Sequence, residues 1–259
     1  MQSPPASRRH AFKRQSRAAL GRGRQIRVAF AAFLGLLAAA LLPAAARAEE
    51  VDLELVFSVD ASGSVDDDEY QLQLDGIAAA ITDSEVLEAI ANGPTARIAV
   101  DLLVWGESRR PKDHTGWFVV DTAQSAAAFA AAVSAFPRRQ TGGTGLGDGI
   151  AKSVSAILEN QYSAPRMVVD VSGDGEETPP RDHTVLLPQA RAMALHFGII
   201  INGLAILNEA PELDDYYRSQ MIVGQGSFVE VAVDYQDFAR AMKRKLLREV
   251  QPEPIVGMR

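Results

Sequence analysis

The sequence predicts an α/β fold: a doubly wound, mostly parallel six-stranded sheet of order 3-2-1-4-5-6, with helices on both faces. Short β-branched and apolar runs alternate with helical patterns along residues 51–250, which is the signature of strand–helix–strand units. Neither a long linker nor an internal repeat interrupts this region. A single domain therefore accounts for it.

Six segments have the length and composition of strands. The first, VDLELVFSV, is apolar enough to be buried on both faces, and RIAVDLLVW and RMVVDVS resemble it. GWFVV is shorter, as expected of an edge strand. In chain order, the predicted strands cover residues 51–59, 97–105, 116–120, 166–172, 198–206 and 227–233.

Helical patterns fill the intervals between these strands. The segment that begins at Asp66 has acids in its first turn, where the helix dipole favours negative charge. The closing helix has a basic stripe, MKRKLLRE, which is predicted to be its solvated face. Its opposite, apolar side is predicted to pack on the sheet and consists of Phe238, Ala241, Met242 and Leu246. The predicted helices cover residues 66–82, 84–91, 125–136, 150–160, 185–197 and 235–250, with a shorter one in DDYYRSQMI.

The first 48 residues have the pattern of a secretory signal peptide. They contain nine Lys and Arg residues, no Asp or Glu, the apolar run VAFAAFLGLLAAALL, and an A-x-A cleavage site at Ala46 and Ala48. The apolar run is shorter than the roughly 20 residues of a membrane-spanning helix. An uncleaved N-terminal anchor is the alternative. We expect cleavage after Ala48, a domain at residues 49–250 and a C-terminal tail at residues 251–259.

Cleavage would leave a strongly acidic protein. Removing nine cations and no anions takes the formal net charge from −7 to −16. Such a surface disfavours nucleic acid and anionic membranes as partners. The chain has no cysteine, which excludes disulfides, thiolate metal sites and a lipid-modified N-terminal Cys. We therefore predict an exported, periplasmic or extracellular protein without a stable membrane anchor after cleavage.

Oxygen-bearing side chains gather where the first strand ends. In FSVDASGSVDDDEY, Asp60, Ser62 and Ser64 occupy alternate positions, and Gly63 lets the chain bend between the serines. One carboxylate and two hydroxyls can then face one point. These hard ligands suit Mg²⁺ or Mn²⁺ rather than zinc or copper. Alone, the segment also fits a turn followed by a helix cap at Ser64 or Asp66.

Two distant segments favour the metal interpretation. Asp174 in VVDVSGDGEE follows a buried strand, and Thr144 in GGTGLGDG precedes a helix, which its side chain would alternatively cap. In the predicted order, the first and fourth strands are neighbours at the point where strand order reverses. Asp60 and Asp174 are therefore expected in the same crevice.

Together these segments resemble the metal-ion-dependent adhesion site of von Willebrand factor type A domains. The D-x-S-x-S motif of that family falls on Asp60, Ser62 and Ser64, its threonine on Thr144, and its second aspartate on Asp174. The resemblance covers nearly all of residues 51–250, and the chain looks most similar to a bacterial family of exported type A domain proteins of unknown function. The stretches that carry it are IAVDLLVW, PRRQTGGT, VVDVSGDG, INGLAI, DDYY and FARAMKRKLLREV.

The resemblance implies how the site works. Ser62, Ser64 and Thr144 would bind the ion directly or nearly so, and the two aspartates would act partly through water. Such a set leaves a coordination position open for a carboxylate of an unidentified protein or acidic ligand. We predict binding of this kind, with Mg²⁺ or Mn²⁺ as cofactor and no catalytic residue. Glu176 and Glu177 beside the site are expected to repel an acidic ligand.

A metal-dependent hydrolase and a scaffold with a purely structural ion are the alternatives. Hydrolysis would need a general base near the metal. Of the histidines after residue 48, His114 lies in a polar loop, His196 lies late in a helix, and His183 has no obvious orienting partner. No nucleophile elbow or P-loop is present in the sequence. The sequence therefore favours binding over catalysis.

Overall fold

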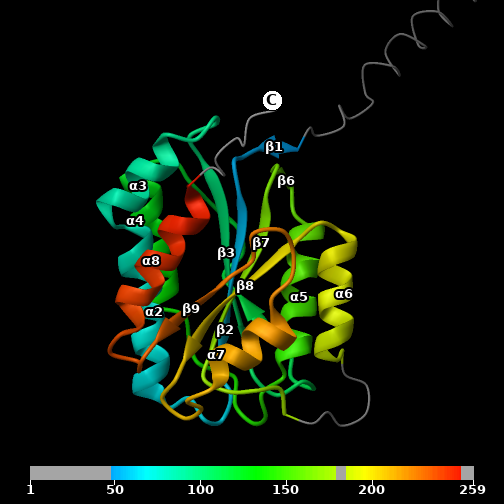
Figure 1. Cartoon of the computed structure of the whole chain (residues 1–259). Coiled ribbons are helices and arrows are strands. Elements are labelled where there is room, and N and C mark those ends of the chain that lie inside the picture. The colour runs from blue at the N-terminus through cyan, green and yellow to red at the C-terminus, as the bar shows by residue number, and fades with distance from the viewer. Residues whose placement is uncertain (1–47, 179–184, 252–259) are drawn as a thin grey trace, which may run out of the picture. The chain divides into compact units, whose positions relative to one another are not determined.

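Two layers of helices enclose a central sheet in the computed structural model, which describes residues 48–178 and 185–251 (Figure 1). The predicted signal peptide and most of the predicted tail lie outside these residues. Within the described part, the main sheet has seven strands in the order β4-β3-β2-β7-β8-β9, and β5 also pairs with β3. The strands are β2 (Glu54–Asp60), β3 (Ile98–Trp105), β4 (Asp113–His114), β5 (Phe118–Val120), β7 (Met167–Gly173), β8 (Ile200–Ile206) and β9 (Val229–Ala232).

The parallel part of the sheet confirms the predicted strand order. β2 lies between β3 and β7 and runs parallel to both, with Asp60 opposite Trp105 and Val59 opposite Ser172. The predicted third strand is β5, which pairs antiparallel with the outer side of β3. Two features are additional: β4, which also pairs antiparallel with β3, and a separate parallel pair of β1 (Glu49–Glu50) and β6 (Tyr162–Ser163). Each of these three strands is two residues long, too short to give a periodic pattern.

The helices occupy the predicted intervals. They are α2 (Asp67–Ile81), α3 (Ser84–Ala91), α4 (Ala123–Ser134), α5 (Leu146–Leu158), α6 (Leu187–His196), α7 (Leu213–Tyr216), a π-helical turn η1 (Tyr217–Met221), and α8 (Phe238–Val250). Helix α5 begins four residues before the predicted start, within the glycine-rich run. A Cβ atom at Gly149 would lie only 2.6 Å from the Trp105 ring, so close packing on β3 requires glycine inside this helix. None of the described helices is long and apolar enough to cross a membrane.

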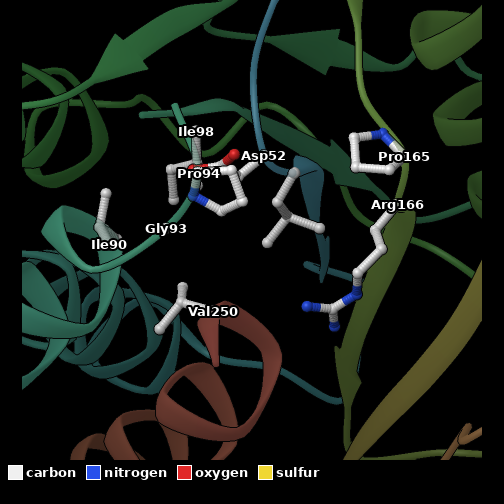
Figure 2. Close-up of a pocket in the computed structure, with 9 residues that line it drawn as sticks. Asp52, Ile90, Gly93, Pro94, Ile98, Pro165, Arg166 and Val250 are labelled. Atoms are coloured by element: carbon white, nitrogen blue, oxygen red, sulfur yellow. The ribbon is translucent and has the colours of Figure 1, made fainter. Parts of the chain in front are cut away.

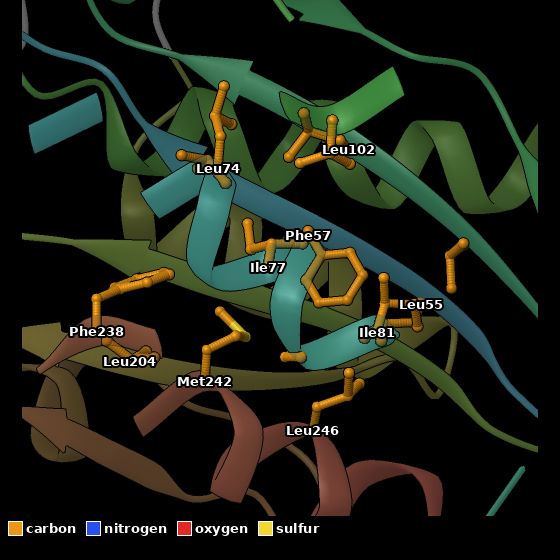
Figure 3. Packing of buried hydrophobic residues seen from close by; sticks show 14 of the residues in the cluster. Leu55, Phe57, Leu74, Ile77, Ile81, Leu102, Leu204, Phe238, Met242 and Leu246 are labelled. Atoms are coloured by element: carbon orange, nitrogen blue, oxygen red, sulfur yellow. The ribbon is translucent and has the colours of Figure 1, made fainter. Parts of the chain in front are cut away.

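The hydrophobic core has one part on each face of the sheet. Helices α2, α3, α4 and α8 cover one face and α5 and α6 the other (Figure 1). Figure 3 shows the first part, in which Phe57 of β2 lies beside Ile77 and Ile81 of α2, and the predicted apolar side of α8, including Met242 and Leu246, belongs to the same cluster. Because every residue of β2 is buried, this strand is held from both faces, and so is the Asp60 at its end.

The basic stripe of α8 is partly buried, contrary to the prediction. Lys245 is fully buried, and its Nζ lies 2.5 Å from Asp170 Oδ1 and 2.6 Å from Glu249 Oε1. Asn202 Nδ2 donates to the same Glu249 oxygen at 2.8 Å. Burial and the Glu249 charge raise the pKa of Asp170, and Lys245 opposes this shift. The prediction was wrong for Lys245 because a lysine that satisfies a buried acid leaves no trace in helical periodicity.

Candidate metal centre

Asp60 lies at the carboxyl edge of the sheet, at the end of β2 furthest from β1 (Figure 1). Its side chain is completely buried, and Oδ1 accepts a hydrogen bond of 2.8 Å from the Ser62 amide. Gln73 of α2 fixes the backbone, because its Nε2 donates to the Asp60 carbonyl at 3.1 Å while its Oε1 accepts from Ser172 Oγ at 3.2 Å. Strand and helix therefore hold the Asp60 carboxylate in one orientation.

The other four predicted residues lie next to Asp60. Ser62 Oγ is 3.4 Å from both Ser64 Oγ and Thr144 Oγ1, and Ser64 Oγ donates to Asp174 Oδ1 at 2.8 Å. An octahedral Mg²⁺ with bonds of about 2.1 Å has neighbouring ligand oxygens about 3 Å apart. The three hydroxyls have nearly this spacing. Ser64 is exposed whereas Ser62 and Asp174 are buried, so the cluster is open to solvent on the side of Ser64.

Each aspartate keeps one oxygen without a partner. Oδ2 of Asp60 and Oδ2 of Asp174 are buried, and neither accepts a hydrogen bond from any residue that the structure describes. Burial, and secondly the charge of Asp174, raises the pKa of Asp60 to about 7, although the Ser62 amide opposes the shift. Two buried carboxylates facing each other are unfavourable without a compensating charge. The residues present therefore fit a divalent cation.

Backbone hydrogen bonds connect the three loops that carry these residues. The Gly63 amide donates to the Gly142 carbonyl at 2.7 Å, which joins the Ser62–Ser64 loop to the Thr144 loop. Gly142 has φ of +88°, and a Cβ there would lie 2.9 Å from Glu107 Cβ, so glycine is required. Thr178 joins the third loop: its Oγ1 accepts from the Thr144 amide at 2.9 Å and its amide donates to the Thr144 carbonyl at 3.0 Å.

Arg138 supports the Ser62–Ser64 loop from outside. Its guanidinium donates to the Ser62 carbonyl at 3.0 Å and to the Val65 carbonyl, and it pairs with Asp67 at 2.8 Å. Arg138, Thr178 and the buried Gln73 are not among the residues predicted for the site. Only Gln73 could have been found from the sequence, because it is a polar residue beside the apolar Leu74 on the buried face of a helix.

The acids near the site differ in their roles. Asp66 caps α2 and forms a capping box with Glu69, as the turn-and-cap interpretation predicted. Thr144 does not cap α5, since the N-cap is Gly145. Instead, the Glu177 carboxylate accepts from the Gly147 amide at 2.9 Å and from the amide of Leu187, at the start of α6, at 3.2 Å. Two helix N-termini thus bind the Glu177 carboxylate and screen part of its charge, whereas Glu176 is exposed.

Histidine contributes nothing to this cluster within residues 48–178 and 185–251. His114 of the edge strand β4 pairs with the buried Asp101 of β3, with 2.9 Å between Nδ1 and Oδ2. His196 ends α6, and the predicted loop residue His183 lies outside the described residues. The described residues also contain no group of three or more His, Cys, Asp or Glu side chains suited to a metal. A cation at the carboxyl edge would therefore depend on the three hydroxyls.

A small cavity lies at the opposite edge of the sheet (Figure 2). Its lining is mostly apolar and includes Ile90, Pro94, Ile98 and Val250. Its two charged side chains are engaged, because Asp52 accepts from the Thr95 amide at 2.9 Å and Arg166 donates to the Gln251 carbonyl at 3.0 Å. The carboxyl edge is therefore the better candidate for polar chemistry.

The fold is that of von Willebrand factor type A domains. The pilus adhesin SpaC from Lactobacillus rhamnosus GG has a TM-score of 0.57 at 12% identity, with 79% of this chain and 31% of SpaC covered. A von Willebrand factor type A protein from Catenulispora acidiphila has a TM-score of 0.53 at 18% identity, with 78% and 43% covered. The chain thus spans less than half of either protein. The vWF domain of the type V pili tip protein Mfa5 from Porphyromonas gingivalis has a TM-score of 0.53 at 9% identity, and the match covers 80% of this chain and 98% of that domain.

Sequence comparison gives the family. Residues 50–254 match the model of the family described as protein of unknown function (DUF1194), and the chain belongs to that family. No curated protein gives a significant match. The predicted type A fold is confirmed by the solved structures, and the predicted family of unknown function by this match.

Proposed function

We propose that this protein is exported and binds a divalent cation, Mg²⁺ or Mn²⁺, with Asp60, Ser62, Ser64, Thr144 and Asp174. The observation that carries the proposal is the pair of buried, unpartnered Oδ2 atoms on Asp60 and Asp174, among the described residues, beside three closely spaced hydroxyls. The bound cation supplies a positive charge with an open position. Because its direct ligands would be mainly neutral hydroxyls and the two aspartates would act partly through water, the ion keeps enough positive charge to accept a carboxylate from a partner.

The partner is a protein or another acidic ligand rather than a reacting substrate. The engagement of Glu177 by two backbone amides supports this, since donors at two helix N-termini screen part of its charge at the opening. A net charge of −16 after cleavage still favours a partner whose carboxylate is surrounded by basic groups. Two structures of similar fold are a pilus adhesin and a pilus tip protein, which agrees with a binding role and with a location outside the cytoplasm.

Thermal melting with MgCl₂ or MnCl₂ tests the cation. We expect the purified wild-type protein to be stabilised by about 2.7 kcal/mol when the metal is at 100 times its Kd, a Tm rise of several degrees for a domain of this size. Thr144→Val removes one ligand at nearly constant shape and should abolish the rise. Thr82→Val, at the exposed end of α2, is the matched control. Equal melting of the wild-type protein with metal and with chelator would refute the proposal.

Capture from the native envelope tests the partner. The immobilised protein is incubated with envelope extract in MgCl₂ or in EDTA, with Thr144→Val as a second bait. A protein retained only by the wild type with Mg²⁺ is expected, and identical retention under all conditions contradicts a metal-mediated partner. The intact mass of the protein recovered after export checks the cleavage after Ala48.

A further inference from the structure

Two buried tyrosines approach the metal site from opposite faces of the sheet. Tyr217 begins η1 and belongs to the core between the sheet and helices α5 and α6, where its side chain is completely buried. Tyr235 lies between β9 and α8 and belongs to the core on the other face, with 2% of its surface exposed. Neither residue is part of the five-residue motif.

The Tyr217 hydroxyl and the Asp60 carboxylate both lie against Gly173 of β7. A Cβ at Gly173 would lie 2.9 Å from the Tyr217 hydroxyl and 3.0 Å from Asp60 Oδ2, so both oxygens border the same small space. A Cβ at Gly203 would lie 2.9 Å from the Tyr217 ring. The two glycines of β7 and β8 therefore give the ring room to lie across the sheet with its hydroxyl at the metal site.

Tyr235 carries a second buried hydroxyl that has no hydrogen-bond partner among the described residues. Burial raises its pKa, and the next largest cause is the negative charge of Asp174. A phenol is protonated at neutral pH without any such shift, so each hydroxyl can donate a hydrogen bond to a nearby carboxylate.

Four buried polar atoms of these residues have no hydrogen-bond partner among the described residues. They are the hydroxyls of Tyr217 and Tyr235, which can donate, and Oδ2 of Asp60 and of Asp174, which can accept. Buried polar groups in proteins are nearly always paired, directly or through an ordered water. Each hydroxyl can satisfy one of the carboxylate oxygens after a small movement or through a water.

We propose that Tyr217 and Tyr235 are positioning residues of the metal site, whose hydroxyls hold the Oδ2 atoms of Asp60 and Asp174 when the cation is bound. This inference rests on the proposed function. Hydrogen bonds to metal-binding carboxylates fix their orientation, and their loss typically lowers metal affinity 10- to 100-fold. The same bonds draw negative charge away from the cation, which strengthens its attraction for a partner's carboxylate.

Isosteric removal of each hydroxyl tests the inference. For Tyr217→Phe and Tyr235→Phe, we expect calorimetric titration with MgCl₂ and MnCl₂ to give a Kd about ten-fold higher than that of the wild type. The Tm in EDTA should stay equal or rise, because an unpaired buried hydroxyl is lost. A merely structural role would instead lower the Tm in EDTA and leave Kd unchanged. Tyr162→Phe, in the separate pair of β1 and β6 far from the carboxyl edge, is the matched control (Figure 1).

The possible outcomes are distinct. If the wild type binds metal and both phenylalanine variants bind it with a Kd within two-fold of the wild-type value, the role of the tyrosines is overturned. The proposed metal site then stays intact. No binding of Mg²⁺ or Mn²⁺ by the wild type overturns both. If one variant fails to fold, the other decides, because the two side chains lie in separate parts of the core.

Discussion

Neutralising Asp60 should stabilise the metal-free protein while abolishing its response to metal. Asp60→Asn keeps the shape of the side chain and the oxygen that accepts from the Ser62 amide. It removes a completely buried negative charge that faces Asp174 and has no compensating cation within hydrogen-bond distance among the described residues. A metal site that lacks its metal is expected to be strained by this charge.

The pKa of Asp60 gives the magnitude. In the folded protein the pKa is about 7, whereas an aspartate in water has its ordinary value of 3.8. At 1.36 kcal/mol per unit, the ionised carboxylate destabilises the metal-free fold by about 4 kcal/mol at high pH. The folded state binds the proton more tightly than the unfolded state does. The free energy of unfolding of the metal-free wild type therefore falls by this amount as the pH rises from about 4 to about 7. The advantage of Asp60→Asn is therefore absent near pH 4 and complete above pH 7.

Thermal melts in EDTA at about pH 4 and pH 8 measure the effect. At 2–4 °C per kcal/mol for a domain of this size, Asp60→Asn should melt roughly 10 °C above the wild type at pH 8. Addition of MgCl₂ should raise the Tm of the wild type only. Asp75→Asn, at an exposed position of α2, should leave both the Tm in EDTA and its rise with MgCl₂ as in the wild type. A variant that melts at or below the wild type at pH 8 in EDTA would refute the reasoning.

Three further substitutions test the surroundings of the site. Arg138→Met should weaken Mg²⁺ binding about ten-fold in calorimetry, because the guanidinium fixes the ligand loop; the exposed Arg139→Met should not. Glu177→Gln should lower the free energy of unfolding by about 1–3 kcal/mol, since one of two helix-terminal amides loses its acceptor; an unchanged urea midpoint would contradict this. Lys245→Met should cost about 3–5 kcal/mol in the same assay by leaving buried carboxylates unpaired, and exposed Lys152→Met serves as its control.

Much of the fold could be predicted because it is written in local patterns. The strand that ends at Asp60 is mostly apolar, as expected for a strand that is buried on both faces of a parallel sheet. The acids that follow mark the start of α2 through the helix dipole. Strand order follows from the alternation of elements, which brings Thr144 and Asp174 to the edge where Asp60 ends.

The tertiary structure alone decided which other side chains join the site. Arg138, Tyr217 and Tyr235 contact or approach the motif across long separations in the sequence, and nothing in their local pattern distinguishes them from surface or core residues. Lys245 repeats the lesson, because its helix reads as amphipathic while its ammonium is buried against Asp170. Sequence periodicity records which way a side chain points; whether a buried charge or hydroxyl finds a partner there depends on elements that only folding brings together.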